Sequence, residues 1–216
     1  MKKALTLFVL IVTPAIAFAQ GTVVFSNNGS SLVKQWTSLY DSTLISVPKS
    51  GGSVELIVAP EGTPLSNPFG YTGISGFSPM YSSLAGFFGA NPGWSAVSIT
   101  SILPIVAGEF NGGVVTINGI AAGAGAEYFV IGWTGPYTTY DAAFAACDFY
   151  NAFFGVSAIA TTSTGNPRTT PPGIPVPLQT TFPGMLLAPQ IMIPEPATAA
   201  LAGLGAVMLM VFRRRR

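Results

Sequence analysis

The stretch SVELIVA, residues 53–59, decides the class of fold. In an extended chain successive side chains point to opposite faces, so Val54, Leu56 and Val58 share one face while Glu55 points the other way. The stretch is rich in β-branched residues, and it is followed by turn-forming Pro60 and Gly62. It is therefore predicted to be a β-strand that packs one face against a core.

Similar short runs recur through the middle of the chain, bounded by Gly, Pro or Asn, and Asn118-Gly119 is predicted to form a type I′ hairpin turn. The predicted strands besides 53–59 are residues 21–27, 44–47, 95–100, 113–119, 127–133, 153–162 and 184–191. Short strands separated by turns predict an all-β fold, a β-sandwich with a jelly-roll-like arrangement.

One segment departs from this pattern, from Thr138 to about Phe153. Its start resembles a capping box, and the alanines that follow are strong helix formers. We predict one short helix here, which closes an end of the sandwich.

Composition agrees with an exported β-protein. Hydrophobic residues make up 49% of the chain and charged residues only 8%, with 25 Gly and 18 Pro. Between Gln20 and Pro194 there are three basic and seven acidic residues, a net charge of −4, although the whole chain carries +1. Such a body lacks the basic surface that phosphates require, so nucleic acid is not an expected partner.

The N-terminus has the three parts of a secretory signal peptide. Lys2 and Lys3 precede an apolar stretch, and Ala17-Phe18-Ala19 forms an A-x-A cleavage site. Residues 1–19 are therefore predicted to be removed, so that the mature chain begins at Gln20. The alternative is an N-terminal helix or strand buried in the domain.

The C-terminus carries an apolar run, residues 197–212, followed by Arg213, Arg214, Arg215 and Arg216. As a helix the run would be about 24 Å long, which approaches the thickness of a membrane core. The arginines would stay on the cytoplasmic side while the preceding domain lies across the membrane. Taken alone, this pattern also fits a permanent transmembrane anchor.

The triplet Pro194, Glu195 and Pro196 stands just before that run. Together the triplet, the apolar helix and the arginine cluster resemble the PEP-CTERM sorting signal of Gram-negative bacteria over residues 193–216. The resemblance implies an exosortase as processing partner, cleavage near the triplet and only transient contact with the membrane. It also implies a final place at the cell surface or in the extracellular matrix, with exopolysaccharide and biofilm as the setting.

The predicted domain, residues 20–192, has a looser resemblance of its own. Its glycine turns, aromatic strand, Tyr-Asp-Ala-Ala helix and Pro-Pro loop are similar in order to exported PEP-CTERM proteins of Verrucomicrobia-type bacteria. This resemblance implies a β-sandwich and brings no catalytic residues with it.

Little in the chain points to catalysis. Histidine is absent and Cys147 is the only cysteine, so neither a nucleophile–histidine pair nor a zinc site is expected. Cys147 is predicted to be a buried structural thiol, and neither a metal nor a cofactor is expected. Glycoside hydrolysis needs only two carboxyl groups, and its candidates are Glu109, Glu127, Asp141 and Asp148. We nevertheless expect a structural or exopolysaccharide-associated protein rather than an enzyme, with no catalytic residues.

Residues 65–94 contain seven aromatic side chains and no charge. Tyr71, Tyr81 and Trp94 are the candidate contacts for a neutral glycan, because such rings stack on sugars and also offer polar groups. This would make the domain a carbohydrate-binding module. The alternative is a long loop that is held over the sandwich by its own aromatic residues.

Overall fold

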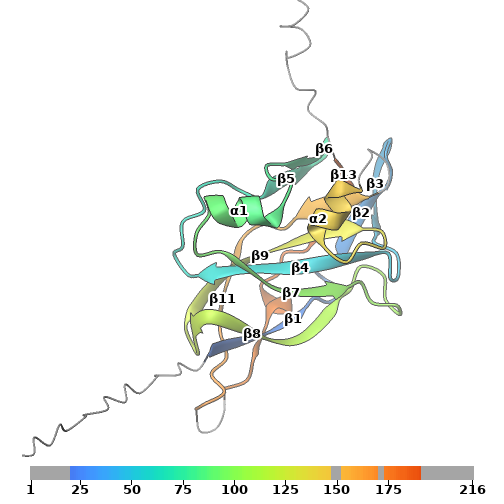
Figure 1. Ribbon diagram of the computed structural model, residues 1–216. Helices are drawn as coiled ribbons and strands as arrows, with labels where there is room; N and C mark the ends of the chain where they lie inside the picture. The colour runs from blue at the N-terminus through green and yellow to red at the C-terminus, as the bar shows by residue number, and fades with distance from the viewer. Residues whose placement is uncertain (1–19, 147–151, 170–172, 191–216) are drawn as a thin grey trace, which may run out of the picture.

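The computed structural model describes residues 20–146, 152–169 and 173–190, and it confirms the all-β class (Figure 1). The main sheet has eight strands, in the order β3-β2-β13-β10-β9-β4-β7, with β11 also paired to β9. These strands are β2 (Val33–Ser38), β3 (Asp41–Ser46), β4 (Gly52–Pro60), β7 (Ser95–Ser101), β9 (Gly125–Thr134), β10 (Phe153–Val156), β11 (Ala160–Ser163) and β13 (Met185–Pro189).

Smaller elements lie on the two faces of the main sheet. One face packs against a three-stranded sheet of order β12-β1-β8, and the other is covered by a hairpin and two helices (Figure 1). These elements are β1 (Gln20–Ser26), β8 (Asn111–Ala121), β12 (Val176–Pro177), the hairpin β5 (Gly70–Gly73) and β6 (Gly76–Pro79), and helices α1 (Leu84–Ala90) and α2 (Tyr140–Ala145). A 3₁₀ turn, Leu178–Thr180, follows β12.

The first hydrophobic cluster lies between the two sheets. Val23 and Phe25 of β1 meet Val54, Leu56 and Val58 of β4 there. The alternation in residues 53–59 therefore has the predicted consequence, because the three residues expected on one face are all buried in the same cluster.

The second cluster lies on the opposite face of β4 and β9. Ile57, Phe129 and Trp133 are buried there beneath the β5–β6 hairpin and the two helices. The central strand β4 is thus buried on both faces. Because Glu55 points to this second face, its carboxyl group is carried into the interior.

The prediction of a hairpin turn at Asn118-Gly119 is wrong. Both residues lie within β8, and the turn follows at residues 122–124, where the Ala124 N–H donates to the Ala121 carbonyl at 3.0 Å. Gly119 has φ of 82°, and the pairing of β1 with β8 shifts beside it, from Gln20–Ala121 to Gly21–Ile117. The dipeptide therefore supplies a β-bulge, which needs a positive φ as much as a turn does.

The predicted helix is α2, although its C-terminal end is wrong. Thr139 caps it by accepting a hydrogen bond from the Ala142 N–H at 3.1 Å. Phe153, however, begins strand β10 and pairs with Pro189. A second helix, α1, was not predicted, and the Asp141 carboxylate ties the two together by accepting the Leu84 N–H at 2.9 Å.

Candidate functional site

The three candidate glycan contacts do not share one exposed surface. Tyr71 lies on β5 with 61% of its surface exposed, whereas Trp94 is only 4% exposed. The Trp94 ring packs 5.3 Å from that of Phe129, and its indole N–H donates to the Pro64 carbonyl at 3.4 Å. Tyr81 is half-buried, edge-on to Phe87. Of the three rings, Tyr71 is the one that is open to a ligand.

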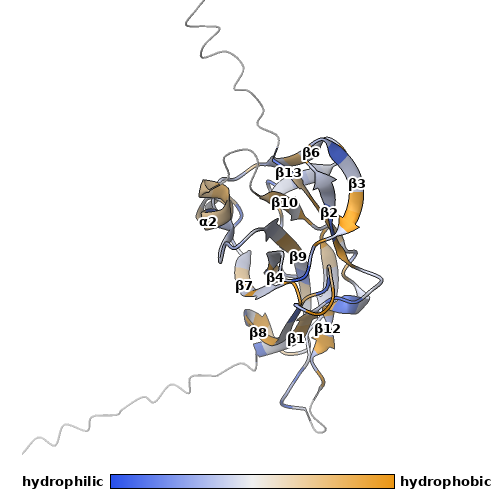
Figure 2. Ribbon diagram, turned by 90° about the vertical axis from the view of Figure 1, so that its right-hand side faces the viewer, coloured by the Kyte–Doolittle hydropathy of each residue, from blue (hydrophilic) through white to orange (hydrophobic). Residues whose placement is uncertain are grey.

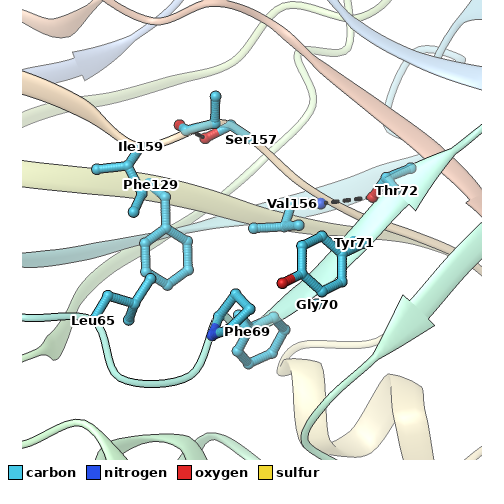
Figure 3. A pocket seen from close by; sticks show the side chains of 11 residues that line it. Leu65, Phe69, Gly70, Tyr71, Thr72, Phe129, Val156, Ser157 and Ile159 are labelled. Atoms are coloured by element: carbon cyan, nitrogen blue, oxygen red, sulfur yellow. Dashed lines mark hydrogen bonds between the residues drawn. The ribbon is translucent and has the colours of Figure 1, made fainter.

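Tyr71 stands at the rim of an open cleft of about 280 Å³ (Figure 3). The cleft lies between the loop before β5, strand β5 itself and the segment that leaves β10. Its lining consists of Leu65, Pro68, Phe69, Gly70, Tyr71, Thr72, Phe129, Val156, Ser157, Ala158 and Ile159. Phe69 and Phe129 also belong to the second cluster, so the rigid core carries one wall of the cleft.

Two hydroxyl groups hold the walls of the cleft in place. The Thr72 Oγ1 accepts the Val156 N–H at 3.1 Å, which ties β5 to β10 (Figure 3). The Ser157 Oγ accepts the Val130 N–H and donates to the Ala158 carbonyl, both at 2.9 Å. The Tyr71 hydroxyl has no protein partner within the described residues. It is therefore the side-chain polar group that the cleft offers to a ligand.

The cleft is neutral as well as partly aromatic. Its lining contains no acid, no base and no cysteine. An exposed tyrosine ring beside apolar walls suits the flat, weakly polar face of an uncharged ring, such as a pyranose. The tyrosine hydroxyl can also form a hydrogen bond with a polar substituent of that ring. The lining supplies no pair of groups for acid–base chemistry.

The acids considered for hydrolysis have other surroundings. Glu127 accepts the Gly62 N–H at 3.0 Å, and Asp141 holds the N-terminus of α1. Glu109 lies near Gly29, and Asp148 and Cys147 are outside the described residues. Within residues 20–146, 152–169 and 173–190, no three His, Cys, Asp or Glu side chains group as metal ligands would.

Sequence reasoning missed the acid with the most unusual environment, Glu55. It is 4% exposed, and its Oε2 has no hydrogen-bond partner among the described residues. Burial raises the pKa of the Glu55 carboxyl from 4.5 to about 7, and the negative charge of Asp141 adds to this shift. Glu55 does not line the Tyr71 cleft. Its position inside an otherwise apolar strand was the signal in the sequence.

The predicted targeting residues fall outside the described part of the chain. These are Ala17 and Ala19, the triplet Pro194 to Pro196, the apolar run 197–212 and Arg213 to Arg216. Among the residues that are described, no helix has the length and apolar character needed to cross a membrane.

Comparison with known proteins identifies the C-terminal tail. Residues 193–216 match the family model of the PEP-CTERM protein-sorting motif. No curated protein and no solved structure matches the chain. The motif implies processing by an exosortase, association with the membrane and sorting to the cell surface. The chain therefore carries a PEP-CTERM sorting motif, and it is an exosortase-targeted exported protein.

Proposed function

We propose that this protein is a non-enzymatic component of the cell surface or extracellular matrix that associates with exopolysaccharide. In this proposal the signal peptide ends at Ala19, and exosortase cuts near Pro194 to Pro196. The domain that remains is a modified β-sandwich, a jelly-roll-like fold with an extra layer over the second cluster.

One observation carries this proposal: in the sequence, the sorting motif begins after every residue of the two described clusters. Both hydrophobic clusters are drawn from residues 23–187, and the last strand of the described residues, β13, ends at Pro189. The motif begins at residue 193. Cleavage near the triplet would therefore leave every side chain of these two clusters in the released part. The neutral cleft, which lacks acid or base side chains, supports a role without catalysis.

The triplet itself supplies the test of processing. Replacing Pro194, Glu195 and Pro196 together by alanine is expected to block cleavage, because it removes the residues near which the exosortase would cut. The variant should then accumulate at full length in the membrane fraction. Fractionation followed by an immunoblot against the β-domain measures its distribution. Equal release of the triplet variant and the wild type would contradict the proposal.

The matched control for the triplet is Pro189→Ala, at the last residue of β13. Pro189 is a proline of the folded domain, it lies before the motif, and it is half-buried at the end of its strand. Its replacement by alanine therefore removes little packing and leaves the motif intact. The control variant should be sorted and released like the wild type.

A second candidate function, carbohydrate binding, is favoured by the exposed ring of Tyr71 at the rim of the neutral cleft. Replacing Tyr71 with alanine is expected to weaken binding to a neutral oligosaccharide by about fivefold, because one stacked ring contributes about 1 kcal/mol. The matched control is Tyr40→Ala, since Tyr40 is also exposed but lies in the turn between β2 and β3.

A glycan array probed with the wild type and both variants measures this effect. The wild type and the Tyr40 variant should bind the same neutral glycans with equal affinity, and the Tyr71 variant should bind them about fivefold more weakly. If the wild type binds no glycan even at millimolar concentration, the binding-module proposal is wrong, while the proposal of a processed surface protein is unaffected. A glycoside hydrolase, the remaining alternative, would instead release reducing ends from the bound glycan.

A further inference from the structure

Strand β3 forms an unpaired edge of the main sheet. It pairs with β2 on one side, and no described strand pairs with its other side (Figure 1). The opposite edge strand, β7, packs near β8, and an Ile102–Phe110 bridge joins the segments that follow and precede them. Within the described residues, β3 is therefore an open edge of this sheet, whereas β7 has β8 alongside it.

The hydrogen-bonding groups of this edge alternate in direction. The Val47 N–H donates to the Val33 carbonyl of β2 at 3.0 Å. Residues of an antiparallel strand alternate between facing the partner strand and facing away from it. Residues 45 and 47 thus face β2, and the backbone groups of Leu44 and Ser46 face outward. Nearer the turn the register of β2 and β3 shifts between Trp36 and Ser38, and the Thr43 N–H donates to the Asp41 carboxylate at 2.9 Å.

After Asp41, the side chains of β3 lack the usual protection of an edge strand. Natural edges carry charged residues or prolines at such positions. From Ser42 to Ser46 there is neither, while Leu44 is 48% exposed and Ile45 is 40% exposed. Figure 2 shows this apolar stretch on β3 at the outer edge of the molecule.

We propose that β3 pairs with β3 of a second copy of this chain, antiparallel and across a two-fold axis. In this register the outward-facing Leu44 lies opposite Leu44 of the second copy, and Ser46 lies opposite Ser42 of the second copy. The Leu44 pair exchanges two backbone hydrogen bonds. This inference goes beyond the proposed function and does not depend on it.

The side chains favour this arrangement over a parallel one. Trp36 pairs with Leu44 within each chain, so the two copies form a continuous apolar row across four strands. Antiparallel pairing also brings Asp41 toward the other end of β3 in the second copy, where Lys34 pairs with Ser46 and Lys49 follows. Parallel pairing would instead place Asp41 beside Asp41 of the second copy.

The two-fold axis also makes the assembly finite. An isologous contact uses the same surface of both copies. Because the contact occupies β3 of both copies, a third copy finds no free β3 edge on which to add. The expected product is a closed dimer.

Disulfide cross-linking in the full chain tests the register. In a Cys147→Ser background, Leu44→Cys is expected to give a linked dimer, because opposed α-carbons in such a pair lie about 5.5 Å apart. The matched control is Ser42→Cys, whose two copies would lie about 14 Å apart along the strands. Non-reducing gel electrophoresis of the exported protein should show at least about tenfold more dimer for Leu44→Cys. Equal cross-linking at the two positions would overturn the proposal.

A second variant tests the dimer without a cross-link. Leu44→Lys places two ammonium groups opposite each other, which should weaken the dimer by about tenfold or more. Ile174→Lys, at an exposed residue in a distant loop, is the control and should leave the dimer unchanged. Analytical ultracentrifugation measures association, and thermal unfolding checks that both variants fold. A wild-type chain that remains monomeric at about 0.1 mM would also overturn the proposal.

Discussion

Replacing Glu55 with glutamine is expected to stabilise the domain by about 2 kcal/mol at pH 8 and to change its stability little at pH 4. Burial holds the pKa of the Glu55 carboxyl at about 7 in the folded chain, against 4.5 as its ordinary value. The folded state therefore retains a proton that the unfolded state releases. Glutamine has nearly the same shape and cannot ionise, so it avoids the cost of a buried charge.

The sign of the pH dependence follows from this order of pKa values. Below about pH 4.5 the carboxyl is protonated in both states, and the wild type loses nothing. As the pH rises from 4.5 to about 7, the unfolded state ionises first, and the wild type loses stability. Above about pH 7 both states are ionised, and the loss is complete.

Urea unfolding at pH 4, 6 and 8, as trial conditions about the two pKa values, measures this difference. The matched control is Glu61→Gln, because Glu61 is exposed on the surface. Glu61→Gln should leave the difference in unfolding free energy between pH 4 and pH 8 as it is in the wild type. If the wild type and the Glu55 variant show the same pH profile, the Glu55 carboxyl reaches water in the folded protein.

Replacing Asn27 with alanine is expected to destabilise the domain by about 3 kcal/mol. The Asn27 side chain donates to the carbonyls of Ser31 and Gly108, at 2.8 and 3.0 Å, and accepts the Phe110 N–H at 2.7 Å. It thus ties the loop after β1 to the segment before β8. Alanine would leave the Phe110 N–H and the Ser31 carbonyl without these partners, while the Gly108 carbonyl would keep the Val33 N–H at 2.9 Å.

The neighbouring Asn28 provides the control. Its side chain is half-buried and accepts hydrogen bonds from the Ser30 N–H and hydroxyl, within its own turn. Asn28→Ala should therefore cost about 1 kcal/mol or less. Urea unfolding of both variants measures the difference. Equal losses would show that the long-range bonds of Asn27 contribute no more than a local turn does.

The strands with strong apolar patterns could be predicted from the sequence, whereas the weak ones could not. In β4, Val54, Leu56 and Val58 indicate both the strand and its buried face. Strand β2, VKQWTS, has no such pattern, because Lys34 is exposed and Gln35 is half-buried. Its place in the sheet depends on pairing with β3 and β13, and the contact with β13 is a distant one that a local pattern does not encode.

In the candidate site, too, contacts between distant segments could not be predicted from local sequence patterns. The aromatic residues of segment 65–94 could be recognised, but their directions depend on tertiary packing. Phe69, Phe87 and Trp94 complete the second cluster around Phe129, and Tyr71 is left outside. The third component of the cleft, residues 156–159, comes from a distant part of the chain. Glu55 was not predicted because an acid within a strand ordinarily marks its solvent-exposed face.

The most direct test of the central claim is the intact mass of the protein recovered from the native cell surface and from the medium. Processing at both ends predicts a chain that begins at Gln20 and ends near Pro194 to Pro196, without the apolar run and its arginines. A chain that still ends at Arg216 in both fractions would contradict processing and would identify the tail as a permanent anchor.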